Sequence, residues 1–142
     1  MRTKKVFSHG KILDRKLYER VQIMDTNIFY GCNNEFKINR EWWVILNDIG
    51  NIIAYCGSIY TEGICIYIRA WVRKDNRGKG IQKKLINIRY KAALKSCHTV
   101  ITYTTQDNYP SANNLISQGF KLYYPEYAYG GKEMLYWIKQ IN

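Results

Sequence analysis

Two glycines within a basic loop have the spacing best suited to binding a phosphorylated ligand. The stretch from Val72 to Leu85 reads as the end of a strand, a turn through Gly78 and Gly80, and the start of a helix. Glycine lets the backbone turn tightly and approach a ligand closely. The first turn of a helix presents unpaired N–H groups and a partial positive charge to an anion. We therefore predict a cradle for a pyrophosphate group at this loop.

The loop differs from two common phosphate-binding loops. A Walker-type loop has two glycines separated by four residues and followed by Lys and then Ser or Thr, and the sequence lacks this pattern. The dinucleotide fingerprint needs a third glycine where this chain has Lys83, and it lies in a parallel βαβ unit. The sequence therefore excludes both of these sites.

Positive charge is concentrated around the same loop. Between Arg69 and Lys95 lie ten of the 22 lysines and arginines and one acidic residue, Asp75, so this segment carries +9 of the net charge of +11. A local excess of this kind suits a phosphorylated ligand or a nucleic acid. The surplus beyond the loop lies on Lys84, Arg89, Lys91 and Lys95.

Length and composition predict one folded domain over residues 1–142. The chain is 46% hydrophobic, which argues against disorder. We find no apolar run long enough for a signal peptide or a membrane span, and we expect a basic cytoplasmic protein, monomeric or homodimeric, without membrane contact. The cysteines, at positions 32, 56, 65 and 97, form no close pair of the kind that binds zinc, so we expect structural thiols and no metal.

Periodicity predicts an α+β (mixed α/β) fold around one sheet. We expect helices at 13–24, 80–95 and 110–118, and strands at 42–46, 52–60, 64–72, 99–105, 120–124 and 133–138, so that the chain starts with a helix. In the strand at 64–72, alternation places Ile64, Ile66, Ile68 and Ala70 on one face and Cys65, Tyr67, Arg69 and Trp71 on the other.

Two motifs resemble those of the GNAT acetyltransferase superfamily. The run Arg77-Gly78-Lys79-Gly80-Ile81-Gln82 resembles the coenzyme A loop of that superfamily, Gln/Arg-x-x-Gly-x-Gly/Ala, with Gln82 in place of the last small residue. The second motif, Asn-x-x-Ala/Ser followed by Gly-Phe, is matched by Asn108, Ser111, Gly119 and Phe120. The resemblance spans residues 42–138.

This resemblance implies a mostly antiparallel central sheet, splayed between its fourth and fifth strands, with helices on both faces. It implies acetyl-coenzyme A as co-substrate, with the thioester in the gap and no metal. The backbone of Trp71, Val72 and Arg73 would pair with the pantetheine arm. Backbone N–H groups would hold the pyrophosphate, with Arg77 and Lys83 near the phosphates; they belong to Gly78, Lys79, Gly80, Ile81, Gln82 and Lys83. Asn108 would lie near the thiol, and it could also cap the helix beginning at Pro110.

The usual acid and base of the superfamily are missing. Many members have a tyrosine seven positions after the motif asparagine, where this chain has Leu115, and others a glutamate five positions before it, where the chain has Tyr103. Tyr103 could donate a proton or line the site. With Tyr103, we take Asn108 and Tyr124 as the candidate catalytic residues. Tyr124 is one of four tyrosines, at 123, 124, 127 and 129, that could form the acceptor pocket or pack together. An ordered water could also deprotonate the amine.

Two functions remain open from the sequence. The first is an N-acetyltransferase in which an amine attacks the thioester directly in a ternary complex. The amine could belong to a protein or peptide, a small molecule, or a nucleic acid. The alternative is a non-catalytic module of the same fold that binds nucleic acid or a partner through Lys84, Arg89, Lys91 and Lys95.

Overall fold

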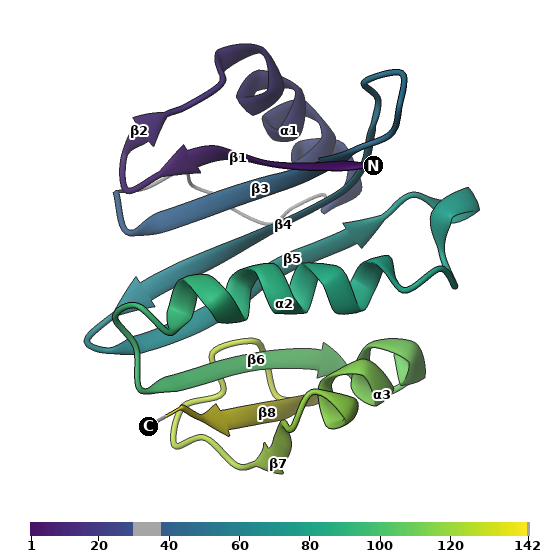
Figure 1. Cartoon of the computed structure of the whole chain (residues 1–142). Coiled ribbons are helices and arrows are strands. Elements are labelled where there is room, and N and C mark those ends of the chain that lie inside the picture. Colours follow the sequence, from purple (N-terminus) through teal and green to yellow (C-terminus); the bar gives the residue numbers. More distant parts are fainter. Residues whose placement is uncertain (30–37, 142) are drawn as a thin grey trace.

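One sheet of eight strands organises the chain in the computed structural model, which describes residues 1–29 and 38–141 (Figure 1). The spatial order is β2-β1-β3-β4-β5-β6-β8-β7, and each neighbouring pair is antiparallel except β5 and β6. The strands are β1 (Arg2–Ser8), β2 (Lys11–Ile12), β3 (Arg40–Leu46), β4 (Ile52–Thr61), β5 (Ile64–Val72), β6 (Thr99–Thr105), β7 (Lys121–Tyr123) and β8 (Met134–Gln140). The helices are α1 (Arg15–Ile28), α2 (Ile81–Ala93), α3 (Tyr109–Ser117) and the short 3₁₀ turn η1 (Lys74–Asn76).

The start of the chain differs from the expectation of an initial helix. Strand β1 precedes α1 and pairs along β3, and a short hairpin joins it to β2. Only Val6 and Phe7 of β1 are buried, and its first residues carry exposed polar side chains. The strand is therefore held mainly by its backbone hydrogen bonds to β3. The fourth and fifth strands of the superfamily, between which we expected the splay, correspond to β5 and β6 of this chain.

Helix α1 begins two residues later than predicted because Asp14 caps it. The Asp14 carboxylate accepts a hydrogen bond from the backbone N–H of Leu17 at 3.1 Å, which satisfies a free donor of the first turn. The buried residues recur every fourth position, at Leu17, Val21 and Asp25. This stripe therefore ends on a carboxylate.

Strands β5 and β6 pair over a short stretch and then separate. Their register joins Ile64–Ile66 to Thr99–Ile101, and the Thr102 hydroxyl donates to the carbonyl of Tyr67 at 3.2 Å. Figure 1 shows the two strands diverging beyond this point, toward the end of the sheet where α2 and α3 lie close together. This gap confirms the predicted splay.

A bulge in β5 changes which faces its residues occupy. Gly57 of β4 pairs with Ile68 and Cys56 pairs with Ala70, so that Arg69 is the extra residue, with φ of +49°. The expectation that Ala70 shares a face with Ile68 is therefore wrong. Ala70 packs in the cluster under α2, whereas Trp71 packs with Ile68 in the cluster under α1.

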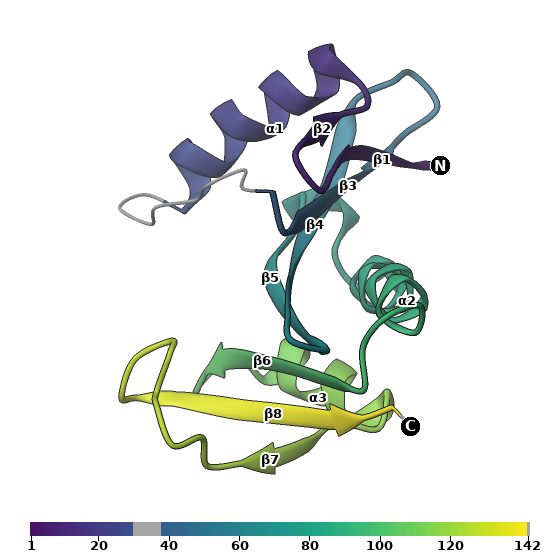
Figure 2. The same ribbon diagram turned by 90° about the vertical axis from the view of Figure 1, so that its left-hand side faces the viewer.

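The helices cover both faces of the sheet, as predicted. Figure 2 shows α1 on one side and α2 on the other, and the loop between β7 and β8 extends toward the side of α1. Helix α2 is the crossover between the parallel strands β5 and β6, and it packs on both β4 and β5. Within residues 1–29 and 38–141, we find no helix with the length and apolar character needed to cross a membrane.

Candidate functional site

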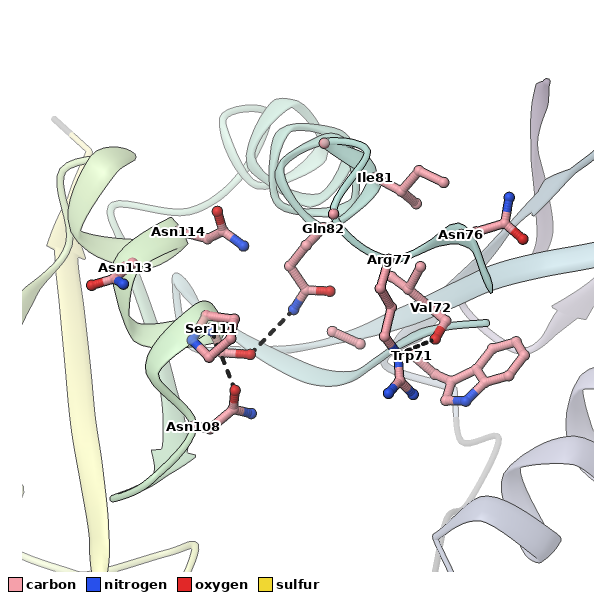
Figure 3. A pocket seen from close by; sticks show the side chains of 14 residues that line it. Trp71, Val72, Asn76, Arg77, Ile81, Gln82, Asn108, Ser111, Asn113 and Asn114 are labelled. Carbon is pink, nitrogen blue, oxygen red and sulfur yellow. Dashed lines mark hydrogen bonds between the residues drawn. The ribbon is translucent and has the colours of Figure 1, made fainter. Parts of the chain in front are cut away.

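A cavity of about 710 Å³ opens at the splayed end of the sheet, between the first turns of α2 and α3 (Figure 3). Its walls come from the end of β5, the following loop and the two helices. The lining residues are Ala70, Trp71, Val72, Asn76, Arg77, Gly78, Gly80, Ile81, Gln82, Asn108, Pro110, Ser111, Asn113 and Asn114. This first cavity brings together most of the residues that the sequence predicted to bind a cofactor.

The glycine loop leaves the first turn of α2 open to a ligand. Gly80 is the N-cap residue and has a left-handed φ of +79°, and Gly78 has φ of +75°. No side chain of the described residues caps this helix, so the first N–H groups stay available beside the cavity. A Cβ atom on Gly78 or Gly80 would meet no atom within 4 Å, so the requirement for glycine here comes from backbone conformation. These features fit a bound pyrophosphate.

Arg77 folds back onto the end of β5. Its Nε donates to the carbonyl oxygen of Val72 at 2.9 Å, and this bond is drawn in Figure 3. Both residues line the first cavity. The guanidinium therefore fixes the path from strand to loop as well as adding positive charge beside the glycines.

Three of the predicted cofactor-binding residues do not line this cavity. Arg73 forms an exposed ion pair with Asp75 at 2.7 Å, and Lys79 and Lys83 are exposed beside the loop. Asn76, which sequence reasoning missed, does line it. Its Oδ1 atom is buried and has no hydrogen-bond partner among the described residues, so it can accept one from a ligand N–H.

Asn108 caps α3, as the sequence suggested. Its Oδ1 accepts from the backbone N–H of Ser111 at 3.3 Å, and the helix begins at Tyr109, one residue before the predicted start. The Ser111 hydroxyl accepts a long hydrogen bond from Nε2 of Gln82 at 3.5 Å. Gln82, which replaces a small residue of the superfamily motif, therefore links the first turns of the two helices across the cavity (Figure 3).

A second cavity, of about 420 Å³, continues from the first through the gap between β5 and β6. The two cavities share Ala70, Gln82, Asn108 and Ser111. The other residues that line it are Phe29, Tyr67, Ile68, Arg69, Ile86, Arg89, Thr102, Tyr103, Thr104, Thr105, Leu115 and Met134. The lining of the second cavity includes residues from both faces of the sheet. Because the two cavities also share four lining residues, a ligand in one could meet a ligand in the other within the gap.

Tyr103 and Tyr124, both predicted as catalytic, lie in different surroundings. Tyr103 is half-buried and lines the second cavity, and a Cβ atom on Gly130 would lie 2.6 Å from its ring, so the glycine backbone is in close contact with it. Tyr124 is fully exposed and lines neither cavity, so the structure does not bring it to the site. Leu115, at the position of the superfamily tyrosine, is buried in the wall of the second cavity.

The tyrosines near Tyr103 pack together on one face of the sheet. Tyr129 contacts Tyr103 and Tyr136 edge to face, at centroid distances of 5.8 and 5.1 Å. Burial and the neighbouring Tyr123 hydroxyl raise the pKa of Tyr129, so this phenol stays protonated. The cluster supports the wall of the second cavity through aromatic contacts.

An ion pair that the sequence did not reveal supports the bulge in β5. Nε of Arg69 donates to Oδ1 of Asp25 at 3.1 Å, and the Tyr55 hydroxyl donates to the same oxygen at 2.7 Å. Burial and the Asp25 carboxylate raise the pKa of Tyr55. The repeat Leu17, Val21, Asp25 could have pointed to this buried carboxylate had the predicted helix been extended past Met24.

The four basic residues expected to contact nucleic acid differ in exposure. Arg89 was expected to be available to nucleic acid, and this expectation is wrong, because Arg89 is only 3% exposed and faces the sheet. Lys84, Lys91 and Lys95 are exposed.

The cysteines and acidic residues give no sign of redox or metal chemistry within the described ranges. Burial raises the pKa of the Cys56 thiol to about 11 and that of Cys65 to about 12, so both stay protonated at neutral pH. Cys97 is half-buried, and Cys32 lies outside the described residues. Residues 1–29 and 38–141 contain no cluster of three or more metal-binding side chains.

Comparison with solved structures shows the same fold in several acetyltransferases. A candidate acyl-coenzyme A N-acyltransferase from Klebsiella pneumoniae has a TM-score of 0.72 at 12% identity, over 99% of this chain and 97% of that chain. A GNAT-family acetyltransferase from Staphylococcus aureus has a TM-score of 0.69 at 14% identity, over 99% and 100%. Arabidopsis thaliana NAA60, solved with a bisubstrate analogue, has a TM-score of 0.69 at 15% identity, over 99% of each chain.

Comparison with sequences identifies the family. The search of curated proteins gives no match. The sequence profile of the acetyltransferase (GNAT) family matches residues 11–120, which is more than half of the chain. The glycine loop, the helix α2 that follows it and the Asn108 motif all lie within this match. The chain therefore belongs to the GNAT family of acetyltransferases.

Proposed function

We propose that the protein transfers an acetyl group from acetyl-coenzyme A to an amine acceptor. The observation that carries this proposal is the uncapped first turn of α2, which opens from Gly80 into a cavity that continues through the splayed sheet. An anion-binding helix end at one side of a gap, with a second cavity beyond it, suits a long phosphorylated thioester and a separate acceptor.

The first cavity would hold coenzyme A. Backbone N–H groups at the start of α2 would bind the pyrophosphate, and Arg77 would add positive charge nearby. The inner edge of β5 at Ala70 and Val72 would pair with the pantetheine arm, because β6 has already diverged there and leaves this edge open. Asn76 would accept a hydrogen bond from an N–H group of the ligand.

The second cavity would hold the amine, which attacks the thioester carbonyl directly in a ternary complex and releases the thiolate. Orientation of the two reactants across the gap can supply about 7–11 kcal/mol of the barrier reduction in favourable cases. A backbone N–H of β5 beside the bulge would stabilise the developing negative charge on the carbonyl oxygen, a contribution of about 3 kcal/mol.

We assign the proton transfer to the Ser111 hydroxyl, which lines both cavities. Because this hydroxyl accepts from Gln82, its own proton is free for donation. The neutral amine attacks, and its nitrogen carries an extra proton once the C–N bond has formed. If Ser111 gives its proton to the departing thiolate and takes this proton from the nitrogen, the serine ends neutral. Tyr103 lines the second cavity but not the first, and we propose that it orients the amine.

The first test measures coenzyme A binding and thiol release. At 100 times its dissociation constant, coenzyme A should stabilise the fold by about 2.7 kcal/mol in thermal unfolding. Acetyl-coenzyme A should release free thiol with at least one member of a panel of small amines, peptides and charged tRNA. A protein that shows neither response at millimolar ligand is not an acetyltransferase.

Two variants separate the roles of the hydroxyls. Ser111→Ala should lower kcat about 100-fold, the lower end of general acid–base contributions, and Tyr103→Phe should lower it less than tenfold. Both variants should retain coenzyme A binding in the thermal assay, which controls for folding. The opposite order of effects would make Tyr103 the proton donor.

A further inference from the structure

Arg89 is a buried arginine in the lining of the second cavity. It is 3% exposed and lies on the face of α2 that packs against the sheet. Its Nε donates to the carbonyl of Leu85 at 3.2 Å, and the guanidinium carbon lies 4.2 Å from the centre of the Tyr67 ring. The side chain is thus held against Tyr67, between α2 and the start of the gap, and it lines the cavity.

The positive charge of Arg89 has no counter-ion in the part of the chain that the structure describes. No carboxylate among residues 1–29 and 38–141 pairs with it, and Nε is its one hydrogen-bonded atom. A guanidinium keeps its charge in a protein, and a buried charge is costly unless it is paired. Two hydrogen-bonding nitrogens of Arg89 therefore remain for a ligand in the cavity.

Tyr67 provides a second unsatisfied group at the same place. Tyr67 lines the second cavity, and its hydroxyl is buried without a hydrogen-bond partner among the described residues. Burial raises the pKa of Tyr67, so the hydroxyl is a donor at neutral pH. Buried polar atoms are nearly always hydrogen-bonded in native proteins, which points to a ligand that completes this pair.

The rest of the cavity wall leaves the net charge positive. In the part of the chain that the structure describes, Arg69 is the other charged residue of the lining, and its charge is paired with the Asp25 carboxylate at 3.1 Å. Among the described residues the lining contains no carboxylate, so no described side chain of the wall repels an anion. The surplus charge is therefore that of Arg89.

We propose that the second cavity receives a carboxylate of a bound ligand, which pairs with Arg89 and accepts a hydrogen bond from the Tyr67 hydroxyl. A carboxylate matches the planar fork of a guanidinium. This inference rests on the proposed function, and it adds that one of the two reactants is a carboxylic acid. The carboxylate could belong to the acyl chain of the thioester or to the amine acceptor.

The experiment compares matched ligands with and without a carboxylate by isothermal titration at low chloride. One arm compares succinyl-coenzyme A with acetyl-coenzyme A. The other compares free leucine and phenylalanine with leucinamide and phenylalaninamide, in the presence of coenzyme A. In one of the two arms we expect the ligand with the carboxylate to bind about tenfold tighter than its match without one. Only a carboxylate that reaches Arg89 can form charge-assisted hydrogen bonds to the buried guanidinium. The arm that shows the difference identifies the source.

Arg89→Met should reduce this affinity ratio to within about twofold. The ligand-free variant should also unfold at the same temperature or a higher one, because an uncompensated buried charge has been replaced by an apolar side chain of similar length. An arginine with a purely structural role predicts the reverse, a lower Tm and an unchanged ratio. Lys91→Met, at an exposed lysine of the same helix, serves as the control and should change neither quantity.

Two conservative variants keep the proposal falsifiable if Arg89→Met fails to fold. Tyr67→Phe removes only the hydroxyl, and Arg89→Lys keeps the charge but loses the planar fork; each should lower the ratio several-fold. Coenzyme A binding with a ratio of one in both arms, or wild-type ratios in both variants, would overturn the carboxylate site and leave the acetyltransferase proposal standing. Absence of coenzyme A binding would overturn the acetyltransferase proposal itself.

Discussion

At the scale of single residues, Gly80 shows most clearly how backbone conformation prepares the site. Its left-handed φ of +79° turns the chain into α2 without a capping side chain, and open space lies where a Cβ atom would be. A larger residue would therefore suffer strain in its backbone without any steric clash. The same strain would pull the first N–H groups of α2 away from the cavity.

Gly80→Ala should lower the free energy of unfolding by about 1 kcal/mol, the usual cost of a left-handed residue with a side chain. It should also weaken coenzyme A binding about tenfold, equivalent to one charge-assisted hydrogen bond. Urea unfolding and calorimetric titration measure the two effects.

Gly50 offers a matched control for this change. It lies in the turn between β3 and β4, has φ of +86° and would likewise place a Cβ atom in open space. Gly50→Ala should lose similar stability and retain wild-type coenzyme A affinity. Equal affinity in both alanine variants would contradict the role given to the first turn of α2.

At the scale of elements, the ion pair between Asp25 and Arg69 holds α1 to the bulge of β5. Asp25 is 2% exposed, and the side chain of Arg69 is 13% exposed, so water does little to screen the pair. The guanidinium carbon also lies 4.9 Å from the centre of the Phe29 ring. The helix end and the bulge are therefore fixed together at the wall of the second cavity.

Asp25→Asn should lower the free energy of unfolding by about 3 kcal/mol, because it leaves the Arg69 charge buried without its carboxylate. Chemical denaturation measures this loss, and adding Arg69→Met to the variant should recover part of it. Glu19→Gln, in an exposed pair with Arg15 on the same helix, is the control and should change stability by less than about 0.5 kcal/mol. If Asp25→Asn also lowered the free energy of unfolding by less than about 0.5 kcal/mol, the buried pair would contribute little to stability.

Sequence pattern predicted the elements that bury regular apolar stripes, and it failed where tertiary contacts decide. Strands β4, β5 and β6 and helix α2 follow from periodicity, and the glycine loop follows from its residue types. Strand β1 was not predicted, because Val6 and Phe7 are its only apolar residues and show no alternating pattern. The bulge at Arg69 depends on the pairing of β4 with β5, which no single segment records.

The same limit explains the residues missed in the site. A helical stripe argument places charged residues on the solvent side, so Asp25 and Arg89 were overlooked or placed outside. In the structure both are buried, Asp25 against Arg69 and Arg89 against the Tyr67 ring. Each partner lies far along the chain, so the local sequence pattern could not reveal the contact.

At the scale of the whole molecule, Glu41 joins three strands at the first half of the sheet. This carboxylate is buried in β3 and accepts from Lys5 at 2.8 Å and Ser8 at 2.7 Å in β1, and from Tyr60 at 2.6 Å in β4. Burial alone would raise the pKa of Glu41, but these hydrogen bonds outweigh it and bring the pKa below its usual value.

A lowered pKa in the folded state means that the charged form of Glu41 stabilises the fold above the pKa of an unfolded glutamate, about 4.3. This contribution should disappear as the pH falls through the lower, folded-state value. Denaturation between pH 7 and pH 3 should show a steeper loss for wild type than for Glu41→Gln. The variant should already be about 2 kcal/mol less stable at pH 7.

Asp48→Asn removes an exposed carboxylate and provides the comparison. Its pH profile should follow that of wild type. Parallel profiles for wild type and Glu41→Gln would show that the hydrogen bonds to Glu41 do not carry the acid sensitivity.

The brief pairing of β5 with β6 also determines how cohesive the molecule is. Three residue pairs of β5 and β6 join the two halves of the sheet, and beyond them the facing backbone edges pair with no strand in the part of the chain that the structure describes. A molecule bound along these edges would act as a temporary strand and would finish the ladder that the chain leaves incomplete. Binding of such a molecule would therefore strengthen the contact between the two halves of the sheet, and its release would weaken that contact again.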